Sequence, residues 1–84
     1  MLELYQAEGC PHSRRVRETM TDLGLSYVVH NPRLPDGTVQ NPGTRRALER
    51  VGGEDQIPLL LDTSQDATVY EAAAIISHLE AHYG

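Results

Sequence analysis

Residues 8–17, Glu-Gly-Cys-Pro-His-Ser-Arg-Arg-Val-Arg, decide the fold predicted for this chain. The segment Leu2-Glu3-Leu4-Tyr5 before them alternates apolar and polar residues, as a short strand does. Pro11 suits the first position of a helix, and Gly24 suits the residue just past its end. Apolar residues recur between them at helical spacing: Val16, Met20 and Leu23. The sequence therefore predicts a strand, a loop and a helix whose N-cap is Cys10.

The middle of the chain continues the alternation of strand and helix. Residues 25–30 are rich in β-forming side chains and follow the helix at once, which predicts a strand parallel to the first. Residues 31–40, with two prolines and Asp36-Gly37, predict a loop. Asn41-Pro42 then reads as an N-cap and a first helical residue, and Gly52-Gly53 ends this brief helix.

The last third of the chain predicts a hairpin and a helix. Residues 58–61 are a compact apolar run suited to a buried strand, and a polar turn separates them from residues 67–70. From Glu71 onward, apolar residues repeat at helical spacing: Ala72, Ile75, Ile76, Leu79 and Tyr83. The predicted order is β-α-β-α-β-β-α, an α/β fold with a mixed four-stranded sheet covered by helices.

Length and cysteine content limit the kinds of protein that this chain can be. With 84 residues it has the size of one domain, so we expect a single domain over residues 1–84 with no helical second domain. One cysteine cannot form an internal disulfide, which favours a reducing compartment. No basic segment followed by an apolar core begins the sequence, and every apolar stretch is too short for a membrane span. We expect a cytoplasmic monomer.

The distribution of charge argues against two classes of partner. All seven basic residues are arginines within the first 50 positions, and the formal net charge of the chain is −5. An acidic chain has the wrong long-range field for nonspecific binding to nucleic acid or to an anionic membrane. Neither nucleic acid nor a membrane is expected as a partner.

Cys10 is the candidate for chemistry, because a helix N-terminus stabilises a thiolate through unpaired N–H groups and the helix dipole. A lone cysteine is more often a small buried apolar residue, and that alternative stays open. Of the arginines that follow, Arg14 is the first candidate to lower the pKa of the thiol. Ser13 either donates a hydrogen bond to the thiolate or satisfies a local backbone group. With serine rather than cysteine at position 13, an external thiol must resolve any mixed disulfide.

Three segments together carry a resemblance to a known family. Cys10-Pro11-His12-Ser13, followed by Arg14-Arg15-Val16-Arg17, resembles the active-site turn of glutaredoxins and of glutathione S-transferase N-terminal domains. Ile57-Pro58 before a strand resembles the cis-proline turn of these thioredoxin-like proteins. Residues 70–76 resemble the transferase segment that begins with an acid and a serine, although Ala72 stands in place of the serine.

The resemblance implies a site for glutathione or a related γ-glutamyl thiol. It assigns Cys10, Ser13 and Arg14 to catalysis, and it assigns six residues to substrate binding: Pro11, His12, Ile57, Pro58, Tyr70 and Glu71. The backbone of Ile57 would bind the ligand like an added strand, and Glu71 would bind the γ-glutamyl amine. The loss of a hydroxyl at Ala72 leaves the γ-glutamyl carboxylate to backbone N–H groups at the helix start.

Plainer alternatives stand beside these roles. Pro58 could be an ordinary trans-proline at a strand start, and Glu71 could be only a favourable acid at a helix N-terminus. His12 could simply be exposed. The candidates to bind the far carboxylate of glutathione are Arg14, Arg45 and Arg46. For Arg45 and Arg46, a position on a solvated helix face is the plainer role. His78 and His82 have metal-capable spacing but no third ligand nearby, so we expect no metal site.

The leading hypothesis is a monothiol glutaredoxin-like thiol-disulfide oxidoreductase. Cys10 would take the small thiol from a protein mixed disulfide, and a second free thiol would regenerate it. One alternative is a noncatalytic carrier in which two subunits use Cys10 and two thiol ligands to hold an iron-sulfur cluster, although Pro11 stiffens the turn where such carriers commonly have glycine. A transferase that conjugates thiols to electrophiles is a third hypothesis, which the lack of a helical domain disfavours.

Overall fold

The computed structural model describes all 84 residues and confirms the predicted α/β class. Its elements, in chain order, are β1 (Leu2–Tyr5), α1 (Pro11–Asp22), β2 (Val28–His30), α2 (Pro42–Gly52), β3 (Leu59–Asp62), β4 (Ala67–Tyr70) and α3 (Ala72–Tyr83). The four strands form one mixed sheet in the order β2-β1-β3-β4. Strands β1 and β2 are parallel, whereas β3 is antiparallel to both β1 and β4.

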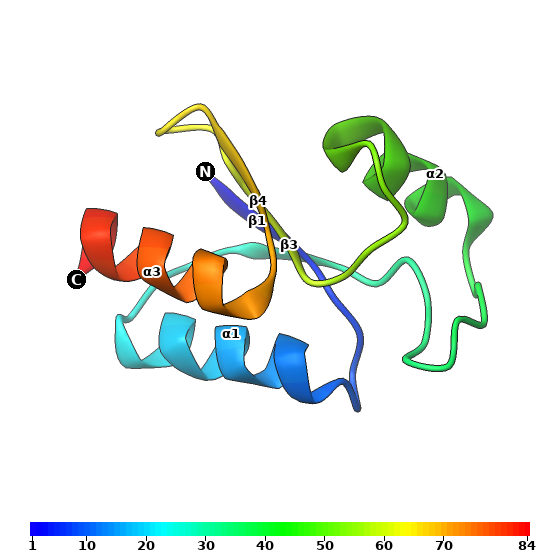
Figure 1. Ribbon diagram of the computed structural model, residues 1–84, viewed down its shortest axis with the longest axis horizontal. Helices are drawn as coiled ribbons and strands as arrows, with labels where there is room; N and C mark the ends of the chain where they lie inside the picture. Colours follow the sequence, from blue (N-terminus) through cyan, green and yellow to red (C-terminus); the bar gives the residue numbers. More distant parts are fainter.

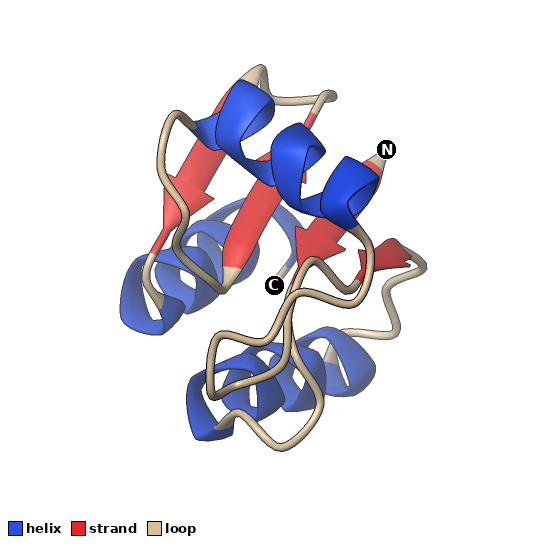
Figure 2. Ribbon diagram, turned by 90° about the vertical axis from the view of Figure 1, so that its right-hand side faces the viewer, coloured by secondary structure: helices blue, strands red, loops and turns tan.

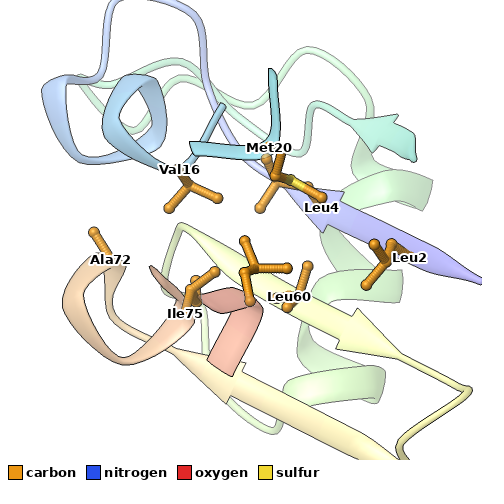
Figure 3. Packing of buried hydrophobic residues seen from close by; sticks show 8 residues of the cluster. Leu2, Leu4, Val16, Met20, Leu60, Ala72 and Ile75 are labelled. Carbon is orange, nitrogen blue, oxygen red and sulfur yellow. The ribbon is translucent and has the colours of Figure 1, made fainter. Parts of the chain in front are cut away.

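The helices form a layer on each face of the sheet. Figure 1 shows α1 and α3 side by side on one face and α2 on the other, and Figure 2 shows the strands between them. The main core lies under α1 and α3 and joins eight buried residues: Leu2, Leu4, Val16, Met20, Leu60, Ala72, Ile75 and Leu79 (Figure 3). A smaller cluster of Tyr5, Leu48 and Leu59 lies under α2.

Alternation along the first strand explains why both faces of the sheet are covered. Leu2 and Leu4 belong to the main core, whereas Tyr5 belongs to the cluster under α2. Successive side chains of a strand point to opposite faces, so one strand serves both layers. Packing on both faces holds β1 in place, and this positions the loop that leads from β1 to α1.

The helix ends follow the signals in the sequence. Cys10 is the N-cap of α1, with Pro11 in the first helical turn, and Gly24 after the helix has a φ of +67°. Asn41 caps α2 by accepting hydrogen bonds from the N–H groups of Gly43 and Thr44. Each of these residues satisfies a backbone requirement that arises where a helix begins or ends.

The second strand is shorter than the sequence predicts. Residues 25–30 were expected to be extended, but only Val28–His30 pair with β1. The N–H of Leu25 donates to the carbonyl of Met20 at 2.9 Å, so this residue closes the end of α1 instead of joining the sheet. Leu25 and Tyr27 pack against the main core, which accounts for their apolar character without strand pairing.

A buried carboxylate at the end of β3 is a feature that the sequence did not predict. Asp62 is 0% exposed, and its Oδ2 accepts hydrogen bonds from His78 Nε2 at 2.9 Å and from the Tyr83 hydroxyl at 2.8 Å. Its Oδ1 accepts from the N–H of Ser64 at 3.2 Å. Burial raises the pKa of Asp62, but the hydrogen bonds from His78 and Tyr83 outweigh it and hold the pKa below its usual value. The network fastens α3 to the end of the sheet.

The end of α2 is packed so closely that glycine is required at position 52. A Cβ there would lie 2.7 Å from Tyr70 Cζ and 2.8 Å from Leu59 Cδ2. The Tyr70 side chain has no freedom to withdraw, because its hydroxyl is bound to both the N–H and the C=O of Glu54. We expect Gly52→Ala to lower the free energy of unfolding by about 1–3 kcal/mol, as overpacking does. Urea unfolding checks this, and an alanine variant as stable as the unsubstituted protein would contradict it.

None of the three helices combines the length and the hydrophobicity that crossing a bilayer demands.

Candidate functional site

Cys10 lies in the turn between β1 and α1, where it is 9% exposed. Its backbone is extended (φ −89°, ψ 117°), and its side chain makes no capping hydrogen bond to the helix. Burial raises the pKa of the thiol, but several groups act in the other direction: the Ser13 hydroxyl, the N–H groups of Ser13 and His12, and the charge of Arg33. Together they hold the pKa of Cys10 below its ordinary value. Cys10 is thus nearly buried, and the groups around it favour the thiolate form.

The loop that carries Cys10 is held by a polar network. Gln6 is buried, accepts a short hydrogen bond from Arg17 Nη1 and donates one to Asn31 Oδ1. Arg17 also forms an ion pair with Glu8 at 3.0 Å. These contacts join α1, the residues before Cys10 and the loop after β2. They hold the loop that precedes Cys10 against α1 and the loop after β2.

Ser13 combines both roles that the sequence left open. Its hydroxyl lowers the pKa of the Cys10 thiol, and its Oγ accepts a hydrogen bond from the N–H of Ala7 at 3.3 Å. The Ser13 side chain is fully buried. Ser13 therefore supports the thiolate and satisfies the backbone of the preceding loop at the same time.

Replacing Ser13 with alanine should raise the pKa of Cys10, because the thiolate loses a hydroxyl group that favours its charged form. Alkylation by iodoacetamide should then become slower at every pH below the pKa of the variant. The buried N–H of Ala7 loses its partner as well, which should cost about 1–3 kcal/mol of stability. A pH series of alkylation rates, read by intact mass, checks the pKa. Ser26→Ala is the control, since Ser26 is exposed; an unchanged profile for Ser13→Ala would contradict the expectation.

The arginine that acts on the thiol is not the one expected. Arg14 was the first candidate, but its Nε pairs with Glu18 Oε1 at 2.9 Å on the exposed side of α1. Arg33 supplies the positive charge that lowers the pKa of Cys10. Arg33 lies in the loop after β2, 23 positions along the sequence, and no local spacing signal indicates its approach. The prediction for Arg14 as the pKa-lowering group is therefore wrong.

A cleft lies beside the first turn of α1, and we call it the Pro58 cleft. Its volume is about 170 Å³, and its lining residues are His12, Gln56, Ile57, Pro58, Glu71 and Ala72. The peptide bond between Ile57 and Pro58 is cis, which confirms the expected turn. The N–H and C=O of Ile57 make no hydrogen bond within the chain, so both are available to a ligand.

Glu71 stands at the entrance of α3 in a rare backbone conformation. It is the N-cap, with φ +75° and ψ 129°, and its side chain does not cap the helix. Its Oε1 accepts a weak hydrogen bond from Gln56 Nε2 at 3.4 Å. The N–H groups of the first turn of α3 therefore lack side-chain partners at the edge of the Pro58 cleft. A carboxylate and free backbone donors meet there.

Three other candidate residues do not border this cleft. Tyr70 was expected to bind substrate, but its hydroxyl is bound to the backbone of Glu54 and its ring packs against the cluster under α2. Arg45 forms ion pairs with Asp55 at 3.0 Å and Glu49 at 3.3 Å. Arg46 is exposed on α2. The described contacts give these three residues structural or solvated positions.

The expected metal-capable pair also has a different part in the structure. His78 belongs to the Asp62 network, and the rings of His78 and His82 lie 4.5 Å apart between centroids. No three histidine, cysteine or carboxylate side chains are grouped as ligands for a metal ion.

A second cavity borders Cys10 on the outer side of α1, and we call it the arginine groove. Its volume is about 650 Å³, and it is lined by Cys10 and Pro11 together with Arg14, Arg15, Arg17 and Glu18. The first turn of α1 thus lies between the two cavities, with His12 on the Pro58 cleft and Cys10 on the arginine groove.

A parallel β1–α1–β2 unit, an antiparallel β3–β4 hairpin, a cysteine at the start of α1 and a cis-proline before β3 define a thioredoxin-like domain. Within that class, residues 4–84 match the sequence model of the family described as "Glutathione S-transferase, N-terminal domain". The chain belongs to this family. Among curated proteins, none matches the sequence.

Solved structures agree with this assignment. The glutathione transferase URE2P6 from Phanerochaete chrysosporium, in complex with oxidized glutathione, is 30% identical with a TM-score of 0.75, over 98% of this chain and 36% of that one. A glutathione transferase homolog from Drosophila mojavensis with bound glutathione is 25% identical with a TM-score of 0.77, over 99% and 35%. Glutathione Transferase E6 from Drosophila melanogaster shares the fold at 24% identity, with a TM-score of 0.77 over 100% and 36%. The chain spans about a third of the length of these proteins.

Proposed function

We propose that this domain binds glutathione in the Pro58 cleft and exchanges it with mixed disulfides through the thiolate of Cys10. The observation that carries the proposal is the place of the thiol at the start of α1, where the Ser13 hydroxyl and the first N–H groups of the helix lower its pKa. A thiolate attacks disulfide sulfur directly, which no hydroxyl at this position would do. Cys10 would therefore be a nucleophile and not only a donor to glutathione.

The residues of the cleft offer complementary groups for the backbone and the γ-glutamyl part of glutathione. The free N–H and C=O of Ile57 would pair with the ligand backbone as an added strand does. The carboxylate of Glu71 would bind the γ-glutamyl amine, and the uncapped N–H groups of α3 would bind the γ-glutamyl carboxylate. Two solved relatives, at 30% and 25% identity, have glutathione or its oxidized form bound, which supports this ligand.

The exchange takes two displacement steps. The Cys10 thiolate attacks the glutathione sulfur of a mixed disulfide, a new S–S bond forms, the old one breaks, and the partner leaves as a thiolate. A second glutathione thiolate then attacks the glutathione sulfur on Cys10, which releases glutathione disulfide and restores the Cys10 thiolate. Electrons and atoms balance without a metal or a further oxidant. Because the second displacement uses an external thiol, the single cysteine of the chain is sufficient.

Conjugation of glutathione to electrophiles is the second candidate function. The solved relatives named above are glutathione transferases or a homolog of one, which favours this chemistry for the family. In conjugation the group at the helix start would stabilise the thiolate of glutathione and would not itself become modified. The two candidates therefore differ in whether a covalent bond forms at Cys10.

Intact mass spectrometry separates these candidates in one experiment. The protein is mixed with glutathione disulfide, and the proposed exchange predicts a rapid mass increase of one glutathione that disappears when free glutathione is added. Glu71→Gln should slow the formation of this adduct, because the γ-glutamyl amine loses its counter-charge, and Glu54→Gln on the exposed loop before β3 serves as the control. A protein that conjugates glutathione to a test electrophile but never carries glutathione on Cys10 would contradict the exchange mechanism.

A further inference from the structure

The arginine groove is a second surface beside Cys10, separate from the Pro58 cleft. Three of its four charged lining side chains are positive, although the net charge of the whole chain is −5. All four come from α1, at positions that follow the thiol within two helical turns: Arg14, Arg15, Arg17 and Glu18. The groove is therefore a local basic region in an acidic protein, and it touches the residue that would perform the exchange.

The ion pairs show which of these charges a ligand could use. Arg17 is committed to Glu8 and to the buried Gln6. Arg14 contacts Glu18 through Nε alone, and both side chains are largely exposed, at 73% and 63%. An exposed pair of this kind contributes little and is easily exchanged for another partner.

Arg15 and the end of Arg14 are the free donors of the groove. Arg15 forms no ion pair with any acid of the chain, and the two terminal nitrogens of Arg14 have no hydrogen-bond partner. A guanidinium group presents its donors in a fork that matches a carboxylate. The groove therefore offers one uncompensated positive charge and several unoccupied donors.

We propose that the arginine groove binds the partner of glutathione in the mixed disulfide, and that this partner is an acidic peptide with carboxylates beside its cysteine. The inference rests on the proposed exchange at Cys10. The peptide would extend from the Pro58 cleft across the first turn of α1 into the groove. Arg15 and the terminal nitrogens of Arg14 would bind the carboxylates of the peptide.

Alkylation of Cys10 tests the charge preference of the groove without any glutathione. The ratio of the rate constants for iodoacetate and iodoacetamide should be higher for Cys10 than for free cysteine, and it should fall as sodium chloride is added. Arg15→Gln should lower the ratio by roughly two- to fivefold, the scale expected when one unit charge near the reacting sulfur is lost in a mostly aqueous setting. Glu18→Gln should raise it. Arg50→Gln is the matched control, because it removes the same charge from an exposed position on α2.

Glutathionylated peptides test the substrate class directly. Two glutathionylated peptides are used, one with glutamates and one with lysines beside its cysteine. The reference substrate is the mixed disulfide of glutathione and 2-mercaptoethanol, in which the 2-mercaptoethanol part is uncharged. A faster reaction of the acidic peptide, lost in Arg15→Gln, supports the proposal. Equal rates for both peptides, with normal transfer from the neutral disulfide, overturn the proposal and leave the exchange function intact. Transfer from none of the three overturns both, and an alkylation ratio equal to that of free cysteine overturns the groove by itself.

Discussion

Replacing Cys10 with serine should abolish glutathione exchange and leave the domain folded. A serine hydroxyl is not ionised at neutral pH and does not attack disulfides, so turnover should fall by at least about a thousandfold, the scale for loss of a covalent nucleophile. The fold should not suffer, because Cys10 makes no capping hydrogen bond to α1 and serine is a favoured N-cap residue. We expect the stability of Cys10→Ser to equal or exceed that of the unsubstituted protein.

The measurement is exchange of glutathione between two small thiols, followed by mass spectrometry, with circular dichroism and urea unfolding on the same samples. Retained exchange in the folded serine variant would eliminate Cys10 as the nucleophile. The variant also decides between the two candidate functions. In the conjugation mechanism, the serine hydroxyl would still donate a hydrogen bond to the glutathione thiolate, so conjugation of an electrophile should persist where exchange is lost.

Replacing Asp62 with asparagine should destabilise the domain by about 2–4 kcal/mol. Asparagine has nearly the shape of aspartate, but its amide group is uncharged. The charged oxygen that accepts from His78 and Tyr83 becomes either a neutral carbonyl oxygen or an NH₂ group, which is itself a donor. Hydrogen bonds to a buried charged group contribute more than neutral ones, and a buried donor left without a partner adds a further penalty. A loss of this size is a large fraction of the stability of a domain of 84 residues.

The effect should depend on pH in a defined direction. The pKa of Asp62 is lowered in the folded protein, so its contribution is fully present above the pKa of about 3.9 of an unperturbed aspartate and is lost as pH falls through the lower folded value. The stability difference between the two proteins should therefore shrink only in acid. Urea unfolding at several pH values checks this. Asp66→Asn, an exposed change in the same turn, should alter stability by no more than about 0.5 kcal/mol; an equal loss in both variants would contradict the role of Asp62.

Most of the fold could be predicted because its signals are local. Pro11 and Gly24 mark the ends of α1 through the backbone needs of a helix terminus, and Asn41 does the same for α2. The length of β2 could not be predicted in the same way. Apolar side chains within residues 25–27 suit either a strand or a loop that packs on the core. The hydrogen bond from the N–H of Leu25 to the end of α1 decides for the loop.

The site was predictable where its parts are adjacent in sequence and not where they are distant. The position of Cys10 and the effect of Ser13 on its pKa follow from one helical turn. The cis peptide before Pro58 came from the resemblance, since the residues themselves favoured trans. Arg33 and the Asp62 network depend on side chains brought together by the tertiary fold. A lone aspartate after an apolar strand has no pattern that distinguishes a buried acceptor from an ordinary turn residue.

The backbone of Glu71 has a consequence for how this sequence can evolve. A side chain at φ +75° and ψ 129° carries a conformational penalty of about 1–3 kcal/mol that glycine would not. Selection for thermostability alone should therefore replace this glutamate with glycine, whereas selection for ligand binding should retain a carboxylate at the entrance of α3. Position 71 is a point where the two pressures oppose each other, and a library randomised there and sorted separately for each property should diverge at this residue first.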